Sequence, residues 1–333
     1  MILIMLLIPR GGHAAQTRIM IRIKSRSRNR NGNDSTAMIV IMNRGAGGPE
    51  DPQARIVELF GALGETARIV QPNGDKDIIA VAREAAQSSE RIIVAAGGDG
   101  TISAVASELA GTDKILGVLP IGTLNHFAKD LGLPLDLETA VRTIKEGDTA
   151  NVDAAEVNGR IFINNSSLGI YPQIVSRREA QQERLARGKW PAFLWATIQA
   201  FRRFPFLDLQ VTFEGRQLAR KTAFLFVGNN EYEIAGFKLG SRACLNAGRL
   251  GLYFSHGTGR LGLFRLAFHA LFGRVDQAKD FEAFCVSEAR IETGRRRLLV
   301  ARDGEVEWME TPLHYRIRPG ALRVLVPKEK VAA

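Results

Sequence analysis

The chain has 333 residues, 45% of them hydrophobic, which is enough to bury a large core and favours two domains over one. Its two cysteines, Cys244 and Cys285, exclude a disulfide framework and a cysteine-rich metal site, and they favour a reducing, cytoplasmic compartment. The net charge of +10 would suit nucleic acid or an acidic membrane, so its distribution along the chain decides what it means.

The first 36 residues carry much of this charge. They hold seven basic residues against the single acid Asp34, a net charge of +6 that leaves +4 for the other 297 residues. The apolar run 1–8 is far shorter than the roughly 20 residues of a membrane-spanning helix, and no charged region precedes it as in a signal peptide. We therefore expect residues 1–36 to be a disordered extension, and we expect no nucleic-acid partner for the protein.

From residue 37 to about 150 the sequence alternates strand and helix patterns in the manner of a parallel α/β sheet. The predicted strands are 37–42, 67–70, 91–96 and 115–119, and the predicted helices are 52–63, 75–87, 102–109 and 137–145. Three of the strands end in loops of turn residues, at 43–49, 97–101 and 120–123. Ligands bind at the carboxyl ends of the strands in such folds, so these loops form the candidate site.

The most informative loop is Gly97-Gly98-Asp99-Gly100-Thr101, which lies between a predicted strand and a predicted helix. Glycines let the backbone approach a polyphosphate and adopt positive φ, and the N-terminus of a helix attracts anions. A carboxylate repels phosphate, so Asp99 suggests a bridging Mg²⁺. The alternative is an ordinary turn with Asp99 as the helix N-cap. The residue types alone leave both interpretations open.

Beyond about Ala150 the pattern changes to short strands joined by hairpin turns, of which Asn158-Gly159 suits type I′. Strands are predicted at 152–157, 160–164, 207–213, 217–227, 250–255, 281–286 and 298–301. Helical patterns interrupt them at 173–204 and 261–272, and the second has an apolar face that either packs on the core or meets a bilayer. Residues 151–317 therefore form a β-rich second domain.

Four motifs in this order resemble the landmarks of the diacylglycerol kinase catalytic family, and the match is closest to its bacterial soluble lipid kinases. The motifs are 97–101, 119–125, 165–169 and 303–305. The resemblance extends over about 38–327, nearly the whole folded chain. The glycine loop alone also occurs in NAD kinases, so the specificity comes from the four motifs together.

The resemblance implies an α/β plus β architecture: an N-terminal Rossmann-like nucleotide-binding domain, a C-terminal β-sandwich, and an active site in the cleft between them. The first domain would be 37–150, completed by about 318–328, and the second 151–317. The implied reaction transfers the γ-phosphoryl group of ATP, with Mg²⁺, to the hydroxyl of diacylglycerol or a related lipid alcohol. Such an enzyme of phospholipid metabolism would be cytoplasmic and would contact the membrane surface peripherally. Oligomeric state is left open, with a homodimer as one option.

The resemblance also implies roles for individual residues. Glu305 resembles the general base, Asp303 belongs to the same catalytic segment, and Asp99 would act through the Mg²⁺ carried by ATP. The implied nucleotide-binding residues are Asn43, Gly97, Gly98, Asp99, Gly100, Thr101, Ile102, Ser103, Gly122, Thr123 and Asn125. Without the resemblance, Asp303-Gly304 is a hairpin turn and Glu305 a solvated carboxylate.

Three positions depart from the family pattern. Arg44 stands where the family usually has proline, and His126 stands where it often has aspartate, with Asp130 one helical turn later. Ala247 stands where several bacterial members have an aspartate that binds a structural Mg²⁺. The missing carboxylate argues against a structural metal and does not affect the catalytic Mg²⁺.

Two other functions compete with a lipid kinase. A soluble NAD kinase shares the glycine loop, although the motifs at 165–169 and 303–305 argue against it. A non-catalytic protein that binds a nucleotide or a lipid would account for the departures at Arg44, His126 and Ala247.

Overall fold

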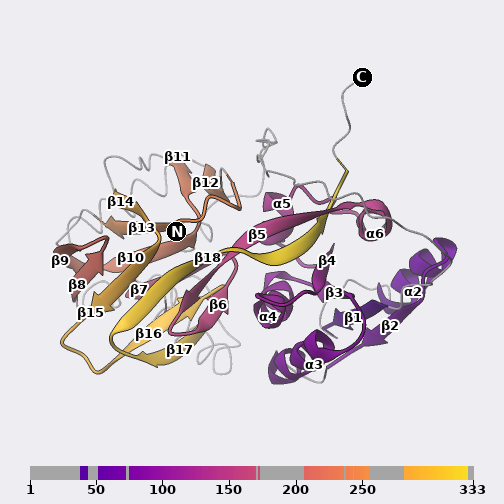
Figure 1. The fold of residues 1–333 in the computed structure, drawn as a ribbon, viewed down its shortest axis with the longest axis horizontal. Helices are drawn as coiled ribbons and strands as arrows, with labels where there is room; N and C mark the ends of the chain where they lie inside the picture. The colour runs from indigo at the N-terminus through magenta and orange to yellow at the C-terminus, as the bar shows by residue number, and fades with distance from the viewer. Residues whose placement is uncertain are drawn as a thin grey trace, which may run out of the picture. The chain divides into compact units, whose positions relative to one another are not determined.

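The computed structural model describes residues 38–43, 52–72, 75–169, 172, 206–235, 238–242, 244–255 and 281–328. These residues fall into two units (Figure 1). The α/β unit runs to Ala154 and also takes Cys244–Gly248 and the residues from Arg318 onward, and the β unit takes the described residues of Ala155–Ala243 and Arg249–Ile317. Several predicted segments lie outside the described residues: the extension 1–36, the first loop beyond Asn43, and the helices at 173–204 and 261–272.

The α/β unit is built on a parallel sheet with strand order β2-β1-β3-β4, and the last residues of β18 (Leu313–Val326) pair parallel to β4. The other strands are β1 (Met38–Met42), β2 (Ala67–Val70), β3 (Ile92–Gly97) and β4 (Ile115–Pro120). β1, β3 and β4 are buried along their whole length, as expected for a parallel sheet covered on both faces. The expected parallel α/β sheet is thereby confirmed.

Five helices accompany this sheet among the described residues: α2 (Pro52–Ala62), α3 (Asp75–Gln87), α4 (Asp99–Leu109), α5 (His126–Asp130) and α6 (Leu137–Glu146). Phe60 of α2 and Val141 of α6 share one hydrophobic cluster with Val40 and Val94 of the sheet. α3 and α4 pack against each other and against β1 and β3. The sheet therefore holds its loops on a rigid, well-packed base.

The β unit is a sandwich of two layers (Figure 1). One layer is an antiparallel sheet with strand order β14-β13-β10-β7-β16-β17, and the other contains β15, β8, β9 and the first part of β18. The strands of this unit are β6 (Arg160–Phe162), β7 (Asn165–Gly169), β8 (Leu207–Phe213), β9 (Arg216–Thr222), β10 (Phe224–Asn229), β13 (Leu250–Ser255), β14 (Phe281–Val286), β15 (Glu288–Glu292), β16 (Arg297–Arg302) and β17 (Glu305–Glu310). β5 (Asp148–Val157) begins in the α/β unit and ends in the β unit, and β11 (Tyr232–Ala235) and β12 (Lys238–Arg242) form a separate small sheet. Leu225 and Val300 of the first layer and Val211 and Ile291 of the second share one core.

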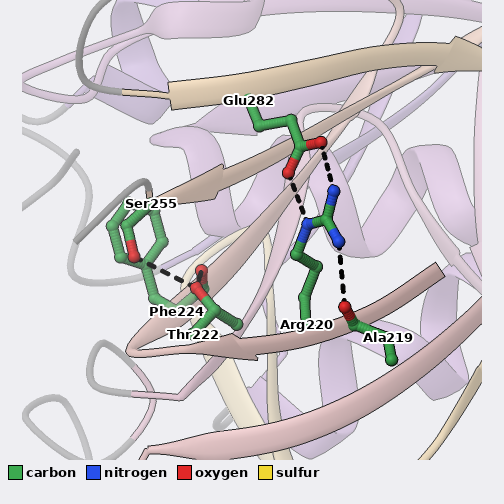
Figure 2. A network of polar contacts seen from close by, with 6 residues as sticks. All are labelled: Ala219, Arg220, Thr222, Phe224, Ser255 and Glu282. Atoms are coloured by element: carbon green, nitrogen blue, oxygen red, sulfur yellow. Dashed lines mark hydrogen bonds and ion pairs between the residues drawn. The ribbon is translucent and has the colours of Figure 1, made fainter. Parts of the chain in front are cut away.

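The single strand predicted at 217–227 is two strands, which was not expected. β9 pairs with β8 in one layer, whereas β10 pairs with β7 and β13 in the other, so the chain changes layers at Ala223. At this corner the Thr222 hydroxyl donates to the Phe224 carbonyl oxygen at 2.7 Å and lies 3.0 Å from the Ser255 hydroxyl (Figure 2). A local apolar pattern does not encode a change of layer, because both halves remain buried.

A bidentate ion pair lies beside this corner. Nε and Nη2 of Arg220 on β9 each lie 2.7 Å from a carboxylate oxygen of Glu282 on β14 (Figure 2). β9 and β14 belong to different layers, so the pair links the two sheets at one edge of the sandwich. The Glu282 carboxylate raises the pKa of the Arg220 guanidinium above its ordinary value, mainly through this hydrogen bond.

Candidate functional site

The glycine loop joins β3 to α4, and its first glycine is needed for space. A Cβ atom on Gly97 would lie 2.6 Å from Cβ of Thr101, which is closer than real side chains come. Neither Gly97, Gly98 nor Gly100 is among the residues with positive φ, so the expectation of left-handed glycines here was wrong. Close packing explains Gly97, whereas a Cβ atom on Gly98 would make only an ordinary contact and one on Gly100 would have open space.

The second predicted loop lies directly against the first. β3 and β4 are parallel neighbours with Gly97 opposite Pro120, so the loops that follow them leave the same edge of the sheet. A Cβ atom on Gly98 would lie 3.6 Å from Cα of Gly122, and one on Gly122 would overlap Cα of Gly98. The motifs 97–101 and 119–125 therefore form one structural feature with two backbones in contact.

Asn125 shapes the second loop from within. It has a left-handed backbone with φ 51°, and its side chain is 5% exposed. Its Nδ2 donates to the carbonyl oxygens of Pro120 at 3.1 Å and Gly122 at 2.8 Å. Asparagine tolerates the left-handed region and bonds readily to nearby backbone, so the residue type fits this turn.

Asp99 is the first residue of α4, and it reaches toward the next helix. The N-cap of α4 is Gly98, without a side-chain cap, so the alternative interpretation of Asp99 as the N-cap was wrong. The Asp99 Oδ1 instead accepts a hydrogen bond from the backbone N–H of Phe127, at 3.3 Å, in the first turn of α5. This bond orients a half-buried carboxylate at the point where the two loops meet.

The remaining predicted nucleotide-binding residues differ in how far their side chains are exposed. Thr101 and Ile102 are buried, at 6% and 0% exposure, so their side chains serve the core. Gly100 and Thr123 are exposed, and a Cβ atom on Gly100 would meet nothing within 4 Å. Asn43 follows β1 directly, and Ser103 is half-buried in α4. The backbone of the first turn of α4, whose N–H groups have no partner within the helix, is thus what the loop offers to a ligand.

The predicted catalytic segment lies in the β unit, on the hairpin between β16 and β17. Asp303 and Gly304 have φ values of 46° and 97°, so both central residues of the turn are left-handed, as in a type I′ hairpin. The Asp303 carboxylate accepts three backbone N–H groups: those of Ile163 and Asn164 at 2.8 Å, between β6 and β7, and that of Asn165 at 3.0 Å, at the start of β7. Glu305 follows as the first residue of β17 and is exposed.

The motif 165–169 forms β7, which lies between β10 and β16. Its contacts hold the same hairpin. The N–H of Asp303 donates to the Asn165 carbonyl oxygen at 2.9 Å, and the Ser166 hydroxyl donates to the Ala301 carbonyl oxygen at 2.8 Å. The Tyr315 hydroxyl lies 2.9 Å from that of Ser166, and burial raises the pKa of the tyrosine well above its ordinary value. The two motifs of the β unit therefore act together to position Glu305.

The segment with Ala247 is held by a carboxylate rather than built as a metal site. Oδ2 of Asp153 accepts the N–H of Gly248 at 2.7 Å, and Oδ1 accepts that of Gly320 at 2.8 Å. No group of three or more His, Cys, Asp and Glu residues that could hold a metal occurs in the described part of the chain. The residues at this position do not fit a structural Mg²⁺.

Sequence reasoning missed Asp153 as an anchor. Its signal was an acid in the buried strand 152–157, because a carboxylate in such a place is found with hydrogen-bond partners. Glu156 in the same strand likewise has a partner, the guanidinium of Arg316. His126 and Asp130, at the other position that departs from the family pattern, lie on α5: His126 is its first residue and is half-buried, and Asp130 is its last residue, with 7% exposure.

None of the described helices is long and apolar enough to span a membrane.

Comparison with known proteins assigns both units. Residues 37–157 match the family model of the diacylglycerol kinase catalytic domain, and residues 171–326 match that of the YegS C-terminal NAD kinase beta sandwich-like domain. A diacylglycerol kinase of Bacillus subtilis (strain 168) is 29% identical over 285 residues, which are 83% of this chain and 91% of that protein. One of Staphylococcus carnosus (strain TM300) is 30% identical over 175 residues, 52% of this chain and 56% of that protein. The crystal structure of a diacylglycerol kinase from Bacillus anthracis str. Sterne has the same fold, with a TM-score of 0.66 at 21% identity over 90% of this chain and 100% of that one.

Proposed function

Because the chain belongs to the diacylglycerol kinase-like lipid kinases, with a diacylglycerol kinase catalytic domain and a YegS-type C-terminal domain, we propose that it phosphorylates diacylglycerol or a related lipid alcohol with ATP. The observation that carries this is the placement of Glu305: an exposed carboxylate on a hairpin whose turn is held by three backbone N–H groups. The α/β unit would bind the nucleotide and the β unit would supply the base.

The phosphates of ATP fit the first turn of α4. The close contact of Gly98 with Gly122 keeps side chains away from the loop, and the position of Gly100 is open. N–H groups and the dipole at a helix N-terminus favour a phosphate there. Thr123 would contact the nucleotide from the second loop. Asn125 would support it indirectly, since its Nδ2 is bonded to the loop backbone.

Substitution of Gly100 by Ala tests this placement. We expect unchanged or slightly higher stability, because alanine is the better helix former by about 0.5–1 kcal/mol, and an ATP affinity lower by about tenfold, because a methyl group would occupy the approach of the phosphates. Gly122→Ala is the contrasting variant, with an expected loss of about 1–3 kcal/mol because its Cβ overlaps Gly98. Thermal melts and ATP titrations measure both. Wild-type ATP affinity in Gly100→Ala would place the phosphates elsewhere.

Asp99 would hold the Mg²⁺ that accompanies ATP. Its Oδ1 bonds to the Phe127 N–H, and no described residue forms a hydrogen bond with its Oδ2. One carboxylate is sufficient for this purpose, because Mg²⁺ in kinases completes its coordination with substrate phosphates and water. When bound, the ion would neutralise negative charge on the transferring group.

Removal of metal should therefore affect activity and stability differently. With EDTA we expect phosphoryl transfer to stop and the melting temperature to stay unchanged, because the segment of Ala247 is held by Asp153 and not by a metal. A melt with and without EDTA, followed by re-addition of Mg²⁺, measures this. A decrease in melting temperature that Mg²⁺ reverses would show a structural site after all.

Glu305 would act as the general base. It would accept the proton of the lipid hydroxyl while that oxygen forms a bond to the γ-phosphorus and the bond from phosphorus to the bridging oxygen of ADP breaks. Asp303 is a positioning residue in this scheme, because its carboxylate is occupied by backbone N–H groups. The products are ADP and a phosphorylated lipid.

The decisive experiment offers radiolabelled ATP and Mg²⁺ with dispersed diacylglycerol, other lipid alcohols and NAD. NAD is included because the C-terminal family model is described as NAD kinase beta sandwich-like. We expect label in one or more lipids and none in NAD. Label in NAD alone would make the protein an NAD kinase, and ATP binding without transfer to any acceptor would make it a non-catalytic binding protein.

A further inference from the structure

An exposed tryptophan lies on the same strand as Glu305. Trp308 is 64% exposed, and the guanidinium carbon of Arg297 lies 6.0 Å from the centre of its ring. β17 is the last strand in its sheet, so this side chain is at an edge of the β unit (Figure 1). Tryptophan is enriched at protein interfaces and in the interface belts of membranes, where one end of the side chain is in an apolar environment and the other in a wet one.

Trp308 belongs to a small apolar face rather than standing alone. The strand register places Leu299 opposite Trp308, and Ala301 opposite Val306. Side chains alternate along strands, and Met309 of β17 lies in the core. Trp308 and the residues that share its side of the sheet therefore lie on the face away from the core. Leu299 and Val306 are half-buried. The face is therefore an apolar strip of which Trp308 is the most exposed part.

Basic residues flank this strip. Arg295, Arg296 and Arg297 lie where the chain enters β16, all three are exposed, and the Arg296 side chain is 91% exposed. Glu310 is the acid on this side, 3.9 Å from Arg296 in a solvent-exposed pair that contributes little. Three cations beside an exposed tryptophan match the requirements of an anionic bilayer, where indole rings lie at the headgroup level and each arginine adds attraction.

A second copy of the chain fits this edge less well than a bilayer does. An exposed edge strand can pair with the same strand of another molecule, and charged side chains along the edge prevent this. β17 carries three acids, Glu305, Glu307 and Glu310, and pairing with a second copy would bring these like charges close to one another. The strip is also small compared with the roughly 1,200–2,000 Å² buried by stable protein interfaces.

We propose that Trp308 and Arg295, Arg296 and Arg297, here called the docking face, bind the β16–β17 hairpin to anionic phospholipid headgroups. Docking does not depend on the proposed function, because no residue of the docking face has a role in the proposed phosphoryl transfer. Glu305 is three residues from Trp308 on β17, so its side chain lies on the opposite face of the strand.

Vesicle co-sedimentation tests the docking face. Full-length protein is mixed with vesicles of phosphatidylcholine alone or with added phosphatidylglycerol, at low and at physiological salt. We expect binding to the anionic vesicles only, weakened by salt. Trp308→Ala should lower the affinity about tenfold, and replacing the three arginines with glutamine should lower it on the order of 100-fold. Wild-type affinity in both variants, or no binding of wild-type protein to anionic vesicles, overturns the proposal.

Matched controls separate docking from other effects. Leu135→Ala removes another exposed apolar side chain, at 48% exposure, and Arg216→Gln removes an exposed arginine from β9; both should bind like wild type. The docking variants should keep the wild-type melting temperature and full activity on short-chain diacylglycerol in solution. A dimer in sedimentation that Trp308→Ala abolishes, without vesicle binding, would assign the face to a second copy instead. Vesicle binding by a protein with no kinase activity would refute the proposed function and leave docking intact.

Discussion

Replacing Glu305 with Gln is expected to lower kcat for lipid phosphorylation by about 10²–10⁴-fold, the usual contribution of a general base. The amide has nearly the same shape and cannot accept the proton of the attacking hydroxyl. Since Glu305 is exposed at the start of β17, its loss should not change the melting temperature. Initial rates with ATP and dispersed diacylglycerol, together with a thermal melt, measure the two effects.

The control for this variant is Glu288→Gln, which removes an exposed carboxylate from β15 and should leave kcat unchanged. ATP affinity should also be unchanged in Glu305→Gln, because the nucleotide is assigned to the other unit. Full activity of Glu305→Gln would remove Glu305 from the mechanism without affecting the family assignment. Loss of ATP binding would mean that the residue serves the nucleotide and not the acceptor.

Replacing Asp303 with Ala is expected to lower the free energy of unfolding by about 2–4 kcal/mol, because three backbone N–H groups would lose a charged acceptor. The positive φ of Asp303, 46°, adds to the cost for alanine. Asp303→Asn keeps the tolerance for this backbone and one acceptor oxygen, but it would turn an N–H₂ group toward a backbone N–H. We expect it to lose roughly half as much stability. Urea unfolding measures both variants.

The same pair of variants distinguishes positioning from chemistry. If Asp303 acts by holding the hairpin, kcat should fall in proportion to the loss of stability, so that Asp303→Asn keeps more activity than Asp303→Ala. The KM for ATP should stay unchanged in both variants. If Asp303 took part in proton transfer, the Asn variant would be as inactive as Glu305→Gln at nearly wild-type stability. That second pattern would contradict the role assigned here.

The predicted elements agree with the structure where hydrophobic periodicity is the cause. β1, β3 and β4 are continuous buried runs, and their pattern alone predicts a parallel sheet. The hairpin at Asn158-Gly159 follows from turn chemistry, and both residues have positive φ as a type I′ turn requires. The break at Ala223 was missed because it depends on the strands with which β9 and β10 pair. β9 pairs with β8 and β10 pairs with β7, and these two partner strands lie in different layers.

The residues of the candidate site, too, could be predicted from the sequence only in part. The resemblance brought the glycine loop and Glu305 to attention, and the family comparison supports the kinase assignment. The positive φ expected for the loop glycines was wrong, and the close approach of Gly122 to Gly98 was not foreseen because it joins two loops that are separate in the sequence. Trp308 attracted no attention in the sequence, since only the register of β16 with β17 shows that it lies opposite Leu299 on the side away from the core.

By itself the sequence determined the order of strands and helices, the positions of the turns and the family, because each of these depends on neighbouring residues and on motifs that can be read locally. The tertiary structure alone decided what several of the conspicuous residues do. Asp303 bonds to N–H groups that lie 138 to 140 positions earlier in the chain, and Asp153 bonds to one that lies 167 positions later. A hydrogen bond depends on distance in space, and no local pattern encodes which distant segments the packed sheets will bring together.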